Sequence, residues 1–156
     1  MSKRINFIVL AALVMLTLFT ANNYPVLSTA INSGDTAWVL VSSALVLIMT
    51  PGLSFFYGGL INKKNVVSTM LQSFVALGVI SVIWVIVGFS LAFGDSIGGI
   101  IGNPLTYFSF NNVGAEPNPA FSSNIPFLLF AIFQLKFAII TPALITGSFA
   151  GRIRFR

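Results

Sequence analysis

The chain has 156 residues, of which 56% are hydrophobic and only 7% are charged, with a formal net charge of +5. Soluble domains carry about 25% charged residues, so a chain this apolar belongs in a lipid bilayer. Because cysteine and histidine are absent and only three residues are acidic, we expect neither an enzyme nor a cofactor or metal site.

The first 30 residues have the pattern of a targeting segment. Lys3 and Arg4 precede an apolar run over residues 5–19, and the small residues Ser28 and Ala30 follow a polar, turn-prone stretch. This order is typical of a secretory signal peptide, which we predict over residues 1–30. The alternative is a short signal anchor that stays in the membrane, although the run is shorter than the about 20 apolar residues of a spanning helix.

Three longer apolar segments follow, each long enough to cross a bilayer as an α-helix. They predict an all-α, polytopic transmembrane helical bundle with spans at about 38–60, 66–93 and 125–150. A short polar connection, residues 61–65, joins the first two, and a long polar loop, residues 94–124, joins the second to the third. Pro51 and Pro142 lie inside spans, and each should bend its helix because it removes a backbone hydrogen bond.

Charged residues alternate between the two ends of these spans. The basic residues that flank one end are Lys3, Arg4, Lys63, Lys64, Arg152, Arg154 and Arg156, and the acidic residues at the other end are Asp35, Asp95 and Glu116. By the positive-inside rule, the connection at 61–65 and both chain termini face the cytoplasm before any signal cleavage. We therefore expect a multi-pass protein of the plasma or inner membrane, and no binding of nucleic acid.

Lys136 breaks this pattern because it lies in the middle of the third span. It is about 3 Å from the midplane of a span centred near residue 138, and its stem is too short to reach the interface about 15 Å away. Its ammonium group should face protein or a watery cavity, or lose its charge. On the same helix Phe133, Phe137 and Gly147 share one face. Their spacing permits either packing or a functional role.

The stretch GDTAWVLVSSALVLIMTPGLSFFYGGLINKKNVVSTMLQS, residues 34–73, is similar to the opening of the ammonium transporter (Amt/Rhesus) family. The stretch FAIFQLKFAIITPALITGSFAGRIRF, residues 130–155, is similar to its third helix. The resemblance implies that residues 34–156 form the N-terminal part of an ammonium transporter domain, a partial version of a fold of eleven helices in two inverted halves. Members of the family assemble as homotrimers.

The resemblance also implies site residues. Phe133 matches an aromatic residue of the external vestibule and Phe137 matches the outer gate phenylalanine, with Gln134 and Lys136 as further candidate pore residues. In the family, aromatic rings recruit ammonium by cation–π attraction. The sequence departs from the family at Lys136, where a small or apolar residue is usual, and at Gly151, where glutamate is usual. A lysine ammonium group beside the gate would repel an ammonium ion or block its path.

These observations together predict transmembrane transport of ammonium or ammonia. We expect this chain to be the N-terminal part of a transporter and not to transport alone. The alternative is a small, non-transporting membrane protein that associates with a full-length transporter and modulates it.

Overall fold

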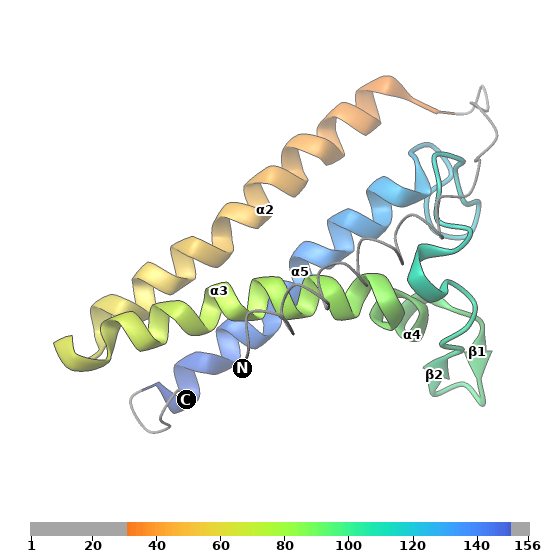
Figure 1. Cartoon of the computed structure of the whole chain (residues 1–156). Helices are drawn as coiled ribbons and strands as arrows, with labels where there is room; N and C mark the ends of the chain where they lie inside the picture. Colours follow the sequence, from red (N-terminus) through yellow and green to blue (C-terminus); the bar gives the residue numbers. More distant parts are fainter. Residues whose placement is uncertain (1–30, 151–156) are drawn as a thin grey trace, which may run out of the picture.

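The computed structural model describes residues 31–150. Three long helices run alongside one another in this part of the chain (Figure 1). The segments long and apolar enough to cross a membrane are Ser33–Leu60, Lys63–Phe93 and Phe127–Ser148. They confirm the predicted helical bundle with three spans. The predicted signal peptide or anchor, residues 1–30, lies outside the described residues.

Helix α2 (Ser33–Leu60) begins ahead of the predicted start at Trp38 because Asn32 caps it. The side-chain oxygen of Asn32 accepts hydrogen bonds from the backbone N–H groups of Gly34 (2.8 Å) and Asp35 (3.1 Å), which satisfies two free donors of the first turn. The backbone N–H of Asn32 donates to the carbonyl oxygen of Asn124 at 2.8 Å. This bond ties the start of α2 to the segment that leads into the third span.

The second span consists of several helical segments in sequence. A short 3₁₀ turn (Lys63–Asn65) leads into α3 (Val66–Ile83), which continues through a π-helical turn (Trp84–Gly88) into α4 (Phe89–Phe93). The span crosses α2 closely near their connection, where the Ser54 hydroxyl donates a hydrogen bond to the carbonyl oxygen of Met70 at 3.1 Å. Backbones approach closely here because small residues line the contact, including Gly58, whose Cα faces Met70.

The long loop after α4 has more structure than its composition predicts. Strands β1 (Ser96–Ile97) and β2 (Ile101–Gly102) pair antiparallel, and a 3₁₀ turn covers Phe108–Phe110. The Ser90 hydroxyl of α4 anchors the loop by donating to the carbonyl oxygen of Asn103 (3.0 Å) and accepting from the N–H of Tyr107 (2.8 Å).

Helix α5 (Phe127–Phe149) is the third span and contacts both α2 and α3. It is continuous through Pro142, as α2 is through Pro51, so neither proline ends its helix. Where α5 begins, an aromatic core joins it to α4 and the loop. The buried members of this core are Phe89, Val113, Phe127 and Ala131, and Trp84, Phe93, Tyr107, Phe110 and Phe130 pack around them.

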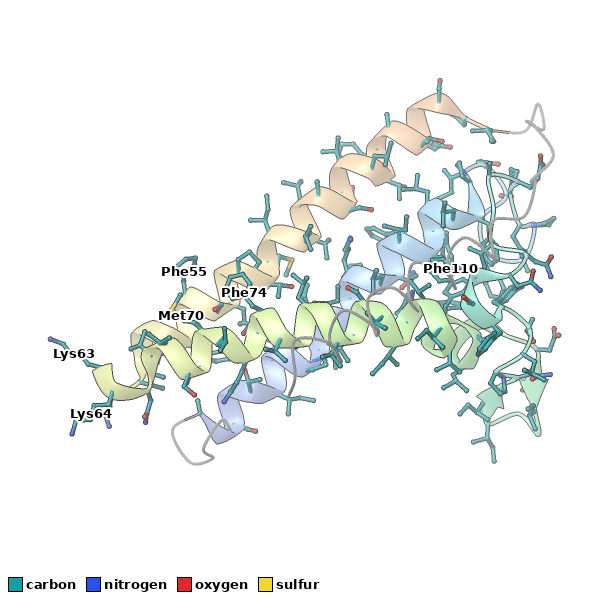
Figure 2. The ribbon with its side chains drawn as sticks, in the orientation of Figure 1. Phe55, Lys63, Lys64, Met70, Phe74 and Phe110 are labelled. Carbon is teal, nitrogen blue, oxygen red and sulfur yellow. The ribbon has the colours of Figure 1, made fainter. Side chains whose placement is uncertain are left out.

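The described charges separate along the bundle. Lys63 and Lys64 lie at the end where α2 meets the second span, far from the end that carries Phe110 and the loop (Figure 2). Asp35 lies in the first turn of α2, which is tied to the loop end, and Asp95 and Glu116 belong to the loop itself. The two ends of the bundle therefore differ in the sign of their charge.

Candidate pore-entrance residues on α5

Two side-chain hydrogen bonds hold α5 in place, one toward each end of the helix. The indole N–H of Trp84 donates to the carbonyl oxygen of Ala131 at 3.1 Å. The hydroxyl of Tyr57, on α2, donates to the carbonyl oxygen of Leu144 at 3.1 Å. Sequence reasoning did not single out Trp84 or Tyr57 as partners of α5, because a backbone carbonyl acceptor leaves no signal in the sequence.

Phe133 and Phe137 lie against each other between these two attachments. Their ring centroids are 5.2 Å apart with an angle of 77° between the ring planes, the edge-to-face arrangement that aromatic pairs favour. Phe133 is partly buried, and Phe137 has 44% of its surface exposed. The spacing of one helical turn therefore gives a direct ring contact.

Phe137 lies on the side of α5 that α2 and α3 leave uncovered, and the half-buried Phe133 lies at the edge of that side, next to the buried Ile140. Leu144, two turns beyond Phe137, is also exposed. The opposite side of α5 packs against its neighbours through the buried residues Leu135, Ile139 and Ala143. Phe137 consequently presents aromatic surface away from the contacts that hold the bundle together.

Lys136 lies on a different side of α5 from Phe137. Consecutive helical residues point about 100° apart, whereas Lys136, Ala143 and Gly147 fall within about 20° of one line along the helix. Ala143 is fully buried, and Gly147 faces the ring of Tyr57 on α2. The stem of Lys136 therefore starts on the α2-facing side of α5 and flanks the aromatic pair.

Gln134 and Lys136 are both partly buried. Neither side chain makes a hydrogen bond or ion pair with another residue within 31–150. Gln134 follows Phe133 directly, near the edge of the uncovered side of α5. As candidate pore residues, both remain predictions.

Polar residues inside the spans bond differently from the interhelical pattern that their types suggest. The Thr141 hydroxyl donates to the carbonyl oxygen of Phe137 in its own helix at 3.0 Å. The hydroxyl oxygens of Thr50 and Ser73 and the side-chain carbonyl oxygen of Gln72 are buried and have no partner among the described residues. The hydroxyl groups of Ser54 and Tyr57, in contrast, do bond across the bundle.

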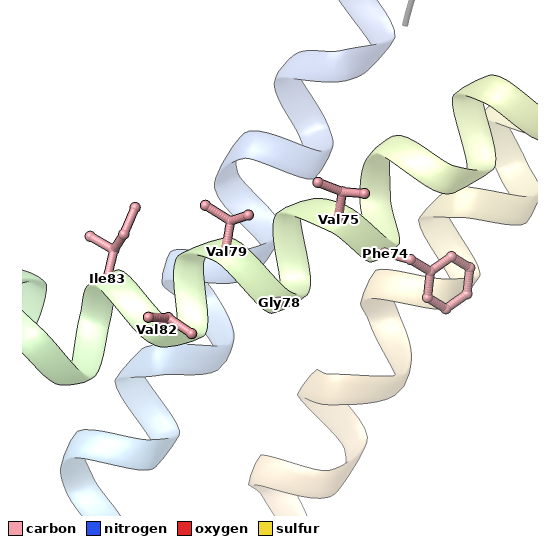
Figure 3. Close-up of a pocket in the computed structure, with 6 residues that line it drawn as sticks. All are labelled: Phe74, Val75, Gly78, Val79, Val82 and Ile83. Atoms are coloured by element: carbon pink, nitrogen blue, oxygen red, sulfur yellow. The ribbon is translucent and has the colours of Figure 1, made fainter. Parts of the chain in front are cut away.

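The outer side of α3 carries an apolar groove of about 600 Å³ (Figure 3). Its lining residues are Phe74, Val75, Gly78, Val79, Val82 and Ile83. The groove has one aromatic ring and no second ring to pair with it, so it is not proposed as an ammonium site. Such a surface is suited to lipid chains.

Three apolar helices joined by small-residue contacts and side-chain-to-carbonyl bonds define a multi-pass membrane protein. The sequence profile of the Ammonium Transporter Family matches residues 37–156. The chain belongs to the ammonium transporter family, as its resemblance to that family indicated.

Individual relatives agree with this assignment. The chain is 47% identical over 137 residues to a Mycobacterium tuberculosis protein named ammonium transporter, a match that covers 80% of this chain and 29% of the relative. It is 48% identical over 126 residues to a putative ammonium transporter of Methanothermobacter thermautotrophicus, covering 80% and 30%. An Aquifex aeolicus ammonium transporter is 47% identical over 126 residues, covering 80% and 29%. The chain thus spans about 30% of the length of these relatives.

The family is named for transport. The relatives described above carry transporter names, so the alternative of a separate modulating protein is not favoured.

Proposed function

We propose that this chain forms the outer entrance of a transmembrane route for ammonium or ammonia. The observation that carries the proposal is the edge-to-face contact of Phe133 and Phe137 on the uncovered side of α5, in a chain of the ammonium transporter family. Aromatic faces attract small cations by about 0.5–2 kcal/mol, more where water is excluded. Two rings at one constriction offset part of the free-energy cost of dehydrating ammonium. They attract ions that keep their water less strongly.

The distribution of charge supports an orientation for this route. Phe133 lies in the first half of α5, nearer the loop that carries Asp95 and Glu116 than the end with Lys63 and Lys64. Acidic groups raise the local concentration of cations, and basic connections stay in the cytoplasm. In the proposed orientation, therefore, the loop end faces outside, both chain termini face the cytoplasm, and the protein resides in the plasma or inner membrane.

The uncovered side of α5 supports a role as one wall of a larger pathway. Phe137 and Leu144 are 44% and 50% exposed, and the family relatives are longer than this chain. We infer that helices equivalent to the remaining length of the relatives complete the wall, and that the complete protein assembles as a homotrimer. The chain by itself is then expected not to transport.

A chimeric transporter tests the function. Residues 37–156 replace the matching segment of the Mycobacterium tuberculosis ammonium transporter, and uptake of radiolabelled methylammonium is measured in cells that lack their own ammonium transporters. The proposal predicts uptake above that of cells with an empty vector, and none by vesicles that contain this chain alone. A chimera that reaches the membrane, folds and takes up no methylammonium would contradict it.

A further inference from the structure

The second span contains a π-helical turn that brings two aromatic residues to the same face. Trp84 and Phe89 are five residues apart, and in a regular α-helix such residues point about 140° apart. Here the Phe89 N–H bonds to the Trp84 carbonyl oxygen across the wider turn, and the two ring centroids are 5.8 Å apart, edge to face. Single π turns occur frequently at functional positions in helices.

The π turn directs both residues at the start of α5. Phe89 is fully buried and lies edge to face with Phe127, with ring centroids 5.4 Å apart. Trp84 donates its indole N–H to the carbonyl oxygen of Ala131 at 3.1 Å. Without the additional residue in this turn, only one of the two side chains could face α5.

Gly88 makes room for this arrangement. A Cβ at position 88 would lie 3.3 Å from the ring of Trp84 and 3.4 Å from the carbonyl oxygen of Ile83. Any side chain at this position would therefore press on the indole ring. The same contact with α5 therefore depends on Trp84, Gly88 and Phe89 together.

We propose that Trp84 is a positioning residue for the aromatic pair. Ala131 is fully buried and precedes Phe133 by half a turn on a helix that is continuous to Phe149. The bond from Trp84 sets the height of the Ala131 carbonyl along the bundle and the rotation of α5 about its axis. Because the helix is continuous, it also sets the direction in which Phe133 and Phe137 point. Phenylalanine would keep an aromatic ring at this position but lacks the N–H donor that tryptophan supplies. The pore role of the pair rests on the proposed function, whereas its positioning by Trp84 does not.

The bond itself can be observed by spectroscopy. In a Trp38→Phe background Trp84 is the only remaining tryptophan, so the ultraviolet resonance Raman band that reports indole N–H bonding belongs to Trp84 alone. The proposal predicts a hydrogen-bonded indole in the chain reconstituted in lipid nanodiscs. A band of a free indole N–H would overturn it, and this measurement does not require that a Trp84 variant fold.

The effect on the aromatic pair is measured with a fluorine label. Trifluoromethyl-phenylalanine at position 137 gives one ¹⁹F NMR signal, and Trp84→Phe is predicted to shift or split that signal. Trp38→Phe is the matched control, because Trp38 is 74% exposed and should leave the signal unchanged. A folded Trp84→Phe chain with an unshifted signal would overturn the proposal. Failure of methylammonium to move the signal in the labelled chain that retains Trp84 would count against the proposed function alone.

Discussion

The ring of Tyr57 lies against the backbone of Gly147, and its hydroxyl bonds to the carbonyl oxygen of Leu144 on the same helix at 3.1 Å. A Cβ at position 147 would lie 2.5 Å from two ring carbons of Tyr57. The glycine that shares a face of α5 with Phe133 and Phe137 therefore has a specific packing partner on α2. Gly151, at which the sequence departs from the family, lies outside the described residues.

Gly147→Ala should destabilise the folded chain because the new methyl group collides with the Tyr57 ring. Overpacking of this kind costs about 1–3 kcal/mol, which thermal unfolding in detergent would report as a lower midpoint. Gly59→Ala is the control, since nothing lies within 4 Å of a Cβ there and alanine favours a helix by about 1 kcal/mol. Equal midpoints for the two variants would contradict the assigned contact.

Phe89→Ala should destabilise the chain by about 3–5 kcal/mol, because it removes a fully buried ring from the core that joins α4, the loop and α5. The same unfolding measurement applies, with Ile100→Ala as the control. Ile100 lies in the tip of the hairpin and is 93% exposed, so its truncation should change the midpoint little. A small effect at Phe89 would mean that this aromatic core does not hold the bundle together.

Membrane orientation can be tested with single cysteines, because the chain has none of its own. Ala115→Cys, in the exposed part of the loop, should react with a membrane-impermeant thiol reagent in intact cells. Asn62→Cys, beside the basic connection, should react only after the membrane is made permeable. The reverse pattern would show that the loop with Asp95 and Glu116 faces the cytoplasm.

Lys136→Met should raise methylammonium uptake by the chimera if the lysine ammonium group flanks the aromatic pair. Two unit charges about 8 Å apart repel each other by about 2 kcal/mol at an effective dielectric constant near 20, so removing the charge should raise uptake by up to about 30-fold. Lys136→Arg keeps the charge and serves as the control. Equal uptake by the two variants would mean that the charge at position 136 does not act on the path.

The sequence alone was sufficient to predict the three spans. Long apolar runs bounded by charged or polar residues define membrane helices because the bilayer fixes their length. The contact of Phe133 with Phe137 also follows from the sequence, since residues four apart lie on one face of a helix. These predictions depend only on local geometry.

The π turn, the loop conformation and the orientation of Lys136 could not be predicted, because they leave no pattern in the sequence. The residues of the π turn, Trp84–Gly88, are nearly all apolar, so no change in periodicity marks the additional residue. The loop owes its shape to left-handed backbone conformations at Ser109, Phe110 and Asn112, which non-glycine residues adopt only in a supporting tertiary context. The side of α5 on which Lys136 lies likewise became clear only from the contacts of Ala143 and Gly147.

The most direct test of the central claim, that Phe133 and Phe137 form part of the entrance for ammonium, is methylammonium uptake by the chimera carrying Phe137→Ala. Loss of a cation–π contribution of about 0.5–2 kcal/mol predicts a fall in uptake of about 2- to 30-fold. Leu128→Ala, which truncates a comparably exposed residue on the opposite side of α5, should leave uptake close to that of the parent chimera. Uptake by Phe137→Ala equal to that of Leu128→Ala, at matched amounts of protein in the membrane, would contradict the claim.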